Sequence, residues 1–316
     1  MRHMRIWRYI DETARSGSLR RAAERLNITP SALQRRIQDV EEDLGTVLFE
    51  RRSNGVALTA AGEAFIRWVR TQASDLQLVQ SQIEDLSGLR RGHVRIACSQ
   101  ALAMSFLPGE IARFAQAHPL VRFAVAVRDH GGAIDALRTY EADLALVFQP
   151  ERYADFQPLM AVGQRLMAVF ATTHPLARQE TIRMRDCAAY PLALPDPSFS
   201  GRRIVDRIMA ASSIKFDVQL EANSFELLRN YVRLGNAVTL QIELGAPLGG
   251  GDTGLVARAL DDKDLAHGSL VLGQLRGRTL PVAVAKFADQ LARQMDALRT
   301  LPTWDGQNFM ADDISS

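Results

Sequence analysis

Residues 18–45 constrain this chain most, because two helical patterns meet there across a three-residue break. The first pattern begins at Ser18, a good N-cap residue, and its apolar positions are Ala22, Ala23 and Leu26. The second opens with a proline in its first turn, where the missing N–H costs nothing. This predicts two packed helices: 18–26, a break at Asn27, Ile28 and Thr29, then 30–44 with the stripe Leu33, Ile37, Val40 and Leu44 before Gly45 as C-cap.

The other face of the second helix is polar and carries side chains that can hydrogen-bond base edges and phosphates. A short helix displaying such residues fits the major groove. We interpret the pair as a helix-turn-helix, although an ordinary helical hairpin with a solvated polar face would show a similar pattern. The predicted DNA contacts here, entry turn included, are Thr29, Pro30, Ser31, Gln34, Arg35 and Gln38.

A hairpin is predicted directly after this motif. Residues 47–49 and 56–58 are short β-prone runs, and Asn54-Gly55 between them favours a type I′ turn. Such a wing could place Arg51, Arg52 and Asn54 against phosphates or a minor groove. Arginines also protect solvated hairpin edges, which is the alternative.

Thr59 is expected to cap a long helix that runs to about Gly88. Its apolar residues step by seven, which is the spacing of a helix-to-helix seam. A homodimer is the simplest source of the second helix, and packing on the chain's own body is the alternative. The predicted seam is Phe65, Val69, Leu76, Val79, Ile83 and Leu86.

From His93 onward, apolar strand runs alternate with helical patterns, which predicts an α/β fold with a largely parallel sheet. Two such series follow one another and are joined by two strand crossings, as in a hinged clamshell. The expected divisions are a DNA-binding domain at 1–58, a linker at 59–91, and an effector domain at 92–301. Lobe 1 is about 92–162 and 268–301, lobe 2 is about 163–267, and 302–316 is expected to be a disordered tail.

Ligands of open α/β sheets bind beyond the carboxyl ends of the strands, next to helix N-termini. Several loops at such positions carry hydroxyl, amide or cationic groups that suit a small anion, with Arg128 as its possible partner. Simple N-capping by Ser99, Ser200 or Ser224 is the alternative. The candidate effector contacts are Ser99, Gln100, Ala101, Arg128, His130, Phe148, Ser198, Phe199, Ser200 and Asn223.

The chain resembles the LysR-type transcriptional regulators over roughly residues 4–299. The resemblance implies a winged helix-turn-helix, a linker helix that mediates dimerisation, and a two-lobed effector domain of the type 2 periplasmic-binding-protein-like fold. It also implies a sequence-specific transcription regulator with an effector cleft between its lobes. The matching residues are Ala22 to Leu26, Ala32-Leu33, Ile37, Glu41-Glu42, Leu44-Gly45, Leu48 to Arg51, Leu58-Thr59, Gly62, His174 to Ala177, Val232, Gly235, Arg278, Leu280 and Phe287.

Composition adds limits rather than an identity. A net charge of +2 is too small to indicate a nucleic-acid partner by itself, and two cysteines without a secretory signal fit a reducing cytoplasm. No metal-ligand spacing or nucleophile motif is present, so we expect neither an enzyme nor a cofactor. The expected partners are promoter DNA, a small effector and a second copy of the chain, with no membrane. The functional alternatives are an effector-independent architectural DNA-binding protein and a solute-binding or enzymatic clamshell.

Overall fold

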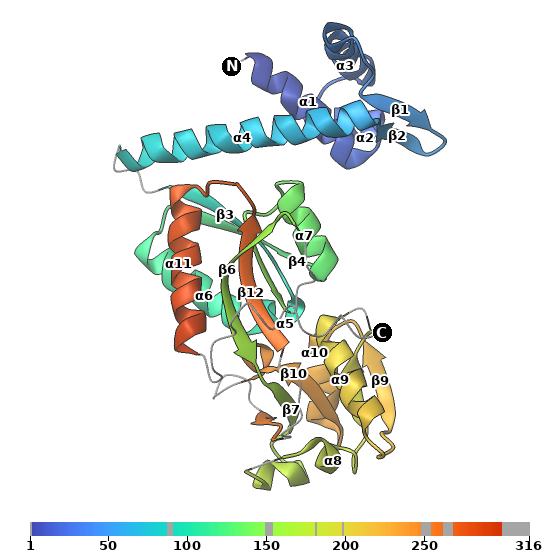
Figure 1. Ribbon diagram of the computed structural model, residues 1–316, viewed down its shortest axis with the longest axis vertical. Coiled ribbons are helices and arrows are strands. Elements are labelled where there is room, and N and C mark those ends of the chain that lie inside the picture. The colour runs from blue at the N-terminus through green and yellow to red at the C-terminus, as the bar shows by residue number, and fades with distance from the viewer. Residues whose placement is uncertain are drawn as a thin grey trace. The chain divides into compact units, whose positions relative to one another are not determined.

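A computed structural model describes residues 2–86, 91–148, 154–180, 182–197, 199–247, 254–261 and 268–298. The chain divides into two compact units, Met1–Gln80 and Ser81–Ser316 (Figure 1). The expected tail at 302–316 lies outside the described residues. Each unit is described by itself.

The first unit contains the two predicted helices with the predicted caps. They are α2 (Leu19–Leu26) and α3 (Pro30–Leu44), preceded by α1 (Arg2–Ser16). The Ser18 hydroxyl accepts the N–H of Arg21, and Gly45 ends α3 with a left-handed φ of 66°. Local sequence signals therefore determine where these helices begin and end.

A small apolar core joins the three helices. Ile10, Ala22, Leu33 and Ile37 are almost fully buried there, and Leu48 closes the core from the segment after α3. The predicted stripe is wrong at its end, because Leu44 remains 45% exposed. The core extends only as far as Val40 on this face of α3.

The wing consists of β1 (Phe49–Arg52) and β2 (Gly55–Leu58), with Arg52 opposite Gly55. The two turn residues are thus Ser53 and Asn54, and the expected type I′ turn at Asn54-Gly55 is wrong. Asn54 does not have the positive φ that such a turn requires. Gly55 has a φ of 144°, and a Cβ there would lie 2.1 Å from the carbonyl oxygen of Gly17. Position 55 is therefore a glycine because a side chain there would collide with Gly17, and the turn itself does not require it.

Helix α4 (Ala60–Leu86) begins as predicted, with the Thr59 hydroxyl accepting the N–H of Gly62 at 3.0 Å. Its first turns belong to the core of the first unit, where Ile66 and Val69 are buried and Phe65 packs beside them. Val79 and Ile83, further along, are 48% and 57% exposed. Only the later half of the predicted seam therefore presents apolar surface. The side chain of Leu86 is outside the described part of the chain.

The second unit has two lobes, each built on a five-stranded sheet (Figure 1). In lobe 1 the strand order is β4-β3-β5-β12-β6, and in lobe 2 it is β11-β7-β10-β8-β9. Lobe 1 contains β3 (Gly92–Cys98), α5 (Gln100–Met104), α6 (Phe106–Ala117), β4 (Val121–Val127), α7 (His130–Arg138), β5 (Leu144–Phe148), β6 (Phe156–Gln164), β12 (Gly268–Leu275) and α11 (Val282–Ala297). Lobe 2 contains β7 (Leu166–Ala171), η1 (Pro175–Arg178), α8 (Met184–Cys187), β8 (Leu192–Pro195), α9 (Ser200–Ala211), β9 (Val218–Ala222), α10 (Phe225–Leu234), β10 (Val238–Ile242), η2 (Glu243–Gly245) and β11 (Leu255–Ala259).

The prediction of a largely parallel sheet holds in both lobes, because four of the five strands in each sheet run in the same direction and one strand is reversed. Strand β3 pairs in parallel with β4 and β5, but β12 is antiparallel to β5 and β6. Lobe 2 repeats this arrangement, with β7 antiparallel to β10 and β11. The reversed strands are the ones that enter each sheet from the other lobe. Each lobe is thus completed by strands that follow a crossing.

A buried ion network stabilises lobe 1. Asp143 is 1% exposed and accepts from the guanidinium groups of Arg95 and Arg278, at 2.6 Å each. Burial opposes ionisation of this carboxyl, but its two arginine partners hold the pKa of Asp143 below its usual value. The network joins the β3 and β5 region to the segment after β12.

Candidate functional sites

The outer face of α3 is the first candidate site. Pro30, Ser31, Arg35 and Gln38 are exposed on it, and Gln34 is half-buried. The hydroxyl of Thr29 accepts the N–H of Ala32 at 3.2 Å, so that side chain caps the helix. Leu33 and Ile37 face the core from the opposite side, and they fix which residues point outward. The buried face of α3 therefore fixes the helix in the unit, and its exposed polar face has a shape that fits a major groove.

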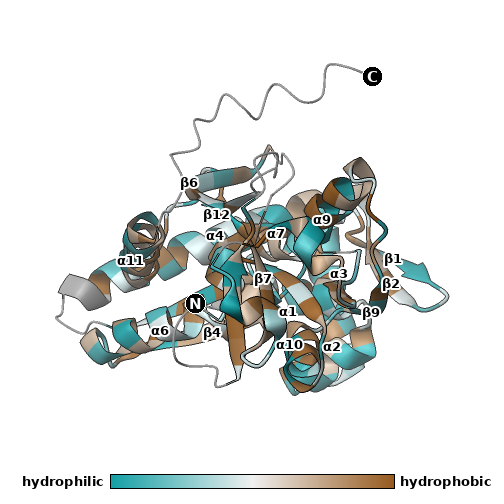
Figure 2. Cartoon of the chain, turned by 90° about the horizontal axis from the view of Figure 1, so that it is seen from below, coloured by the Kyte–Doolittle hydropathy of each residue, from teal (hydrophilic) through white to brown (hydrophobic). Residues whose placement is uncertain are grey.

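The wing contributes two arginines that differ in their surroundings. Both are exposed, and successive strand residues point to opposite faces. The Arg52 guanidinium is paired with the Glu50 carboxylate at 2.7 Å, whereas Arg51 makes no ion pair with any described residue. Figure 2 shows hydrophilic residues in this hairpin, at the labels β1 and β2. Arg51 is thus the wing cation best placed to meet a phosphate.

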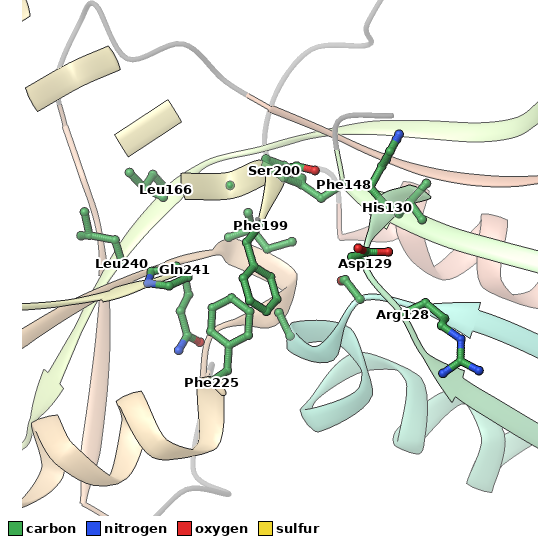
Figure 3. Close-up of a pocket in the computed structure, with 16 residues that line it drawn as sticks. Arg128, Asp129, His130, Phe148, Leu166, Phe199, Ser200, Phe225, Leu240 and Gln241 are labelled. Atoms are coloured by element: carbon green, nitrogen blue, oxygen red, sulfur yellow. The ribbon is translucent and has the colours of Figure 1, made fainter. Parts of the chain in front are cut away.

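A pocket between the two lobes is the second candidate site (Figure 3). Its volume is about 60 Å³. This volume is the space that the centre of a water-sized sphere can occupy. Because one enclosed water needs about 10–15 Å³ of such space, the pocket suits a ligand of a few heavy atoms. Lobe 1 lines it with Ser99, Ala101, Arg128, Asp129, His130, Val147 and Phe148, and lobe 2 with Leu166, Pro195, Phe199, Ser200, Gly201, Phe225, Leu240, Gln241 and Ile242.

The pocket wall is mainly apolar and aromatic. Phe199 and Phe225 meet edge to face with their ring centroids 5.2 Å apart, and Phe148 contributes a third aromatic ring to the lining from lobe 1. The Arg202 guanidinium donates to the carbonyl of Pro195 at 2.8 Å and holds the loop that leads into α9. These contacts give the pocket a fixed lobe 2 wall.

Seven of the ten predicted effector contacts line this pocket, two do not, and one lies outside the described residues. Gln100 instead accepts the N–H of Phe225 at 2.8 Å through its Oε1 atom, which ties α5 to α10. Asn223 is exposed and lies off the pocket wall, and Ser198 is outside the described residues. The lining residues that were predicted are Ser99, Ala101, Arg128, His130, Phe148, Phe199 and Ser200.

Arg128 lines the pocket rim without offering its charge to the interior. Its side chain is exposed, its Nη1 donates to the Val127 carbonyl, and Figure 3 shows the guanidinium directed away from Phe199 and Phe225. The guanidinium therefore points away from the pocket interior here, and its pairing with an anion stays a prediction. The side chain follows the end of β4 outward.

Each lobe contributes to the lining a residue with a polar atom that has no hydrogen-bond partner among the described residues. These atoms are the Ser99 hydroxyl, on lobe 1, and the Gln241 amide nitrogen, on lobe 2. Ser99 does not cap α5 with its side chain, whereas Ser224 does cap α10 by accepting the N–H of Leu227. The capping alternative thus holds for Ser224 and not for Ser99.

Nine lining residues were not among the predicted contacts, and three of them (Asp129, Pro195 and Gly201) lie in the same loops as predicted ones. Most are ordinary core types, so nothing in their own identity distinguishes a pocket wall from a core. Gln241 is different, since an amide inside the buried run VTLQI is a local anomaly that could have indicated a site. The six outside those loops are Val147, Leu166, Phe225, Leu240, Gln241 and Ile242.

Other chemistry receives little support. Cys98 is buried, and burial raises the pKa of its thiol to about 12, which keeps it protonated and unreactive. No group of three or more potential metal ligands occurs within the described ranges. None of the helices in those ranges is both long and apolar enough to span a bilayer.

Comparison with family models covers most of the chain. Residues 4–63 match the model described as "Bacterial regulatory helix-turn-helix protein, lysR family", and residues 87–296 match the "LysR substrate binding domain". The chain therefore belongs to the LysR family of bacterial transcriptional regulators, in which a helix-turn-helix is joined to a domain that binds a small molecule.

Individual relatives are more distant. The chain is 28% identical over 238 residues to the transcriptional dual regulator GltC of Bacillus subtilis, which covers 75% of this chain and 79% of that protein. It is 26% identical to the RuBisCO operon transcriptional regulator of Allochromatium vinosum, over 76% of this chain and 82% of that protein.

Solved structures share the fold at low sequence identity. A full-length OxyR variant from Pseudomonas aeruginosa has a TM-score of 0.68 at 20% identity and covers 91% of this chain and 94% of its own. CbnR in complex with its target DNA has a TM-score of 0.60 at 17% identity, over 92% and 99% of the two chains. The effector-binding domain of QuiR in complex with shikimate has a TM-score of 0.54 at 17% identity, over 66% and 99%.

Proposed function

We propose that this LysR-family regulator acts in the cytoplasm, binds operator DNA as a homo-oligomer, and changes its promoter occupancy when a small anionic effector enters the pocket between its lobes. The pocket is the observation that carries the proposal, because both lobes contribute to its wall. A ligand that contacts both lobes binds one closure better than another. Such differential affinity is what lets a ligand shift a conformational equilibrium.

The proposed DNA contacts are the outer face of α3 and the wing. In support, Ser31, Arg35 and Gln38 are exposed while the same helix is anchored by a buried face. Phosphate contacts from Arg51 would position the unit, and contacts from α3 would select the sequence. The solved relative CbnR has been determined with its target DNA.

The proposed assembly uses the later part of α4. Val79 and Ile83 are four residues apart and expose apolar surface that a second helix would bury. Ile66 and Val69 are already buried within the first unit, so the proposed seam is shorter than the sequence predicts. A dimer would present two recognition helices to two half-sites on one face of the duplex.

The proposed effector carries an anionic group on a mainly apolar body. Helix α9 begins at Ser200 without a side-chain cap on its N-terminal N–H groups, and this end lies at the pocket. A helix N-terminus without a side-chain cap and the helix dipole both favour a negative group there. The aromatic side chains around it suit the apolar remainder.

DNase footprinting of the full-length protein on its own upstream region, with and without a panel of small carboxylates, tests the proposal. We expect at least one carboxylate to change operator affinity by about 1–3 kcal/mol. The Phe199→Ala variant should bind DNA normally and lose that response. Identical protection with every carboxylate, and with Phe199→Ala, would favour the alternative of an effector-independent DNA-binding protein.

A further inference from the structure

Gln241 is a polar residue in an otherwise apolar strand at the pocket. Strand β10 is buried over its whole length, and Gln241 is 2% exposed. Its side chain lies beside Leu240 and Phe225 in Figure 3. A buried amide is retained where its hydrogen bonds are satisfied or where it serves a ligand.

Arg229 of α10 determines how this amide is oriented. Its Nε and Nη2 atoms donate to the Oε1 atom of Gln241 at 3.2 and 3.0 Å, and its Nη2 also donates to the carbonyl of Gly245. A guanidinium has donors only, so it requires the oxygen end of the amide. The guanidinium of Arg229 therefore determines which end of the Gln241 amide is the oxygen and which is the nitrogen.

The other end of the amide is consequently a donor. No described residue accepts from the Nε2 atom of Gln241, and the atom belongs to a residue of the pocket wall. Across the pocket, the Ser99 hydroxyl is likewise buried without a partner among the described residues. A ligand oxygen that met Gln241 would give the donor its missing bond, and the arginine behind the amide would favour negative charge on that oxygen.

We propose that Gln241, positioned by Arg229, selects effectors that present a carboxylate or carbonyl oxygen to lobe 2, and rejects those that present a donor. The inference rests on the proposed function, since it assigns the ligand chemistry of the same pocket. The ligand class is a short-chain carboxylic acid or its amide, with a branched or cyclic apolar remainder that fits about 60 Å³.

Three probes of similar size with the same branched apolar end test the selection in the full-length protein. Isobutyrate and isobutyramide carry acceptor oxygens, whereas isobutylamine carries only a cationic donor group at neutral pH. Affinities are measured by saturation-transfer NMR and by thermal shift at millimolar concentrations. The wild type should bind isobutyrate, whether or not it also binds isobutyramide. It should bind isobutylamine at least tenfold more weakly than isobutyrate.

Two variants separate the donor from the rest of the pocket. Gln241→Glu retains an oxygen for Arg229 but replaces the free donor by an acceptor, so isobutyrate binding should weaken at least tenfold. Gln241→Met removes the donor without adding charge and should also weaken isobutyrate binding, which excludes repulsion as the sole cause. Gln219→Glu makes the same charge change at an exposed position of β9 and should bind as the wild type does.

Equal binding of isobutylamine and isobutyrate to the wild type would overturn the inference, as would unchanged isobutyrate binding by Gln241→Glu. Failure of both acceptor probes to bind the wild type would overturn it too. None of these results affects footprinting with other carboxylates, so the proposed function can stand while the role of Gln241 falls. The reverse also holds, because the probes report binding without any requirement that DNA affinity change.

Discussion

The α3 surface and the interlobe pocket are built in opposite ways. The α3 surface consists of exposed side chains from one short helix, and its buried residues only support it. The pocket consists largely of buried side chains that come from separate strands and loops of both lobes. Changes on the first surface should therefore affect binding and spare stability, whereas changes within the second unit should affect both.

The largest effect should come from the buried network of lobe 1. Asp143→Asn leaves Arg95 and Arg278 without their shared carboxylate, and breaking a buried pair in this way costs about 3–5 kcal/mol. Urea unfolding measures the loss. Asp155→Asn is the matched control, since Asp155 pairs with Arg138 at an exposed site and should cost about 0–1 kcal/mol.

The same network predicts a direction with pH. Because the folded-state pKa of Asp143 is below its usual value, its stabilisation is present above about pH 4 and is lost as the pH falls below that. The wild type should lose stability more steeply than Asp143→Asn in this range. Parallel pH profiles for the two proteins would contradict the assignment.

The proposed dimer seam should show the next effect. Ile83→Asp replaces an apolar side chain whose burial would contribute about 1.5–3 kcal/mol and puts a carboxylate into the interface. Analytical ultracentrifugation should show dissociation at concentrations where the wild type is dimeric. Gln80→Asp adds the same charge at an exposed position of α4 and should leave the dimer intact. An unchanged dimer for Ile83→Asp would place the interface elsewhere.

Recognition-helix changes should cost affinity without stability. Gln34→Ala and Arg35→Ala are each expected to cost about 1–3 kcal/mol on the cognate operator and to relax its specificity. Their urea midpoints should match that of the wild type, because Arg35 is exposed and Gln34 only half-buried. A stability loss comparable to the affinity loss would remove the contrast between the two sites.

The wing should give the smallest and least specific effect. Arg51→Ala should weaken binding on all sequences alike and reduce the salt slope by about 1. Arg52→Ala should do less, because Glu50 already engages that guanidinium. Titrations at several salt concentrations compare the two variants. An effect of Arg51→Ala confined to one operator sequence would mean that the wing, too, selects bases.

The sequence by itself determined the helices and most strands of both units. Ser18, Thr29 and Gly45 mark helix ends through contacts within a few residues, so α2 and α3 follow from local chemistry. The exposed face of α3 follows from helical periodicity once Leu33 and Ile37 are taken as buried. The loops that hold the candidate effector contacts could also be predicted, because parallel strands bring the loops at their carboxyl ends to one edge of the sheet.

Only the tertiary structure decided the rest, because it depends on contacts between residues far apart in the chain. Position 55 requires a glycine because the backbone of Gly17 approaches it, and the strand register places the wing turn at Ser53-Asn54. Strands β12 and β7 enter their sheets reversed because the chain crosses between lobes, and no local pattern encodes that direction. Arg229, twelve residues earlier on α10, donates to the Oε1 atom of Gln241, and this leaves the amide nitrogen as a donor without a partner among the described residues. Hydrogen-bond direction depends on both partners, and a sequence shows only one of them at a time.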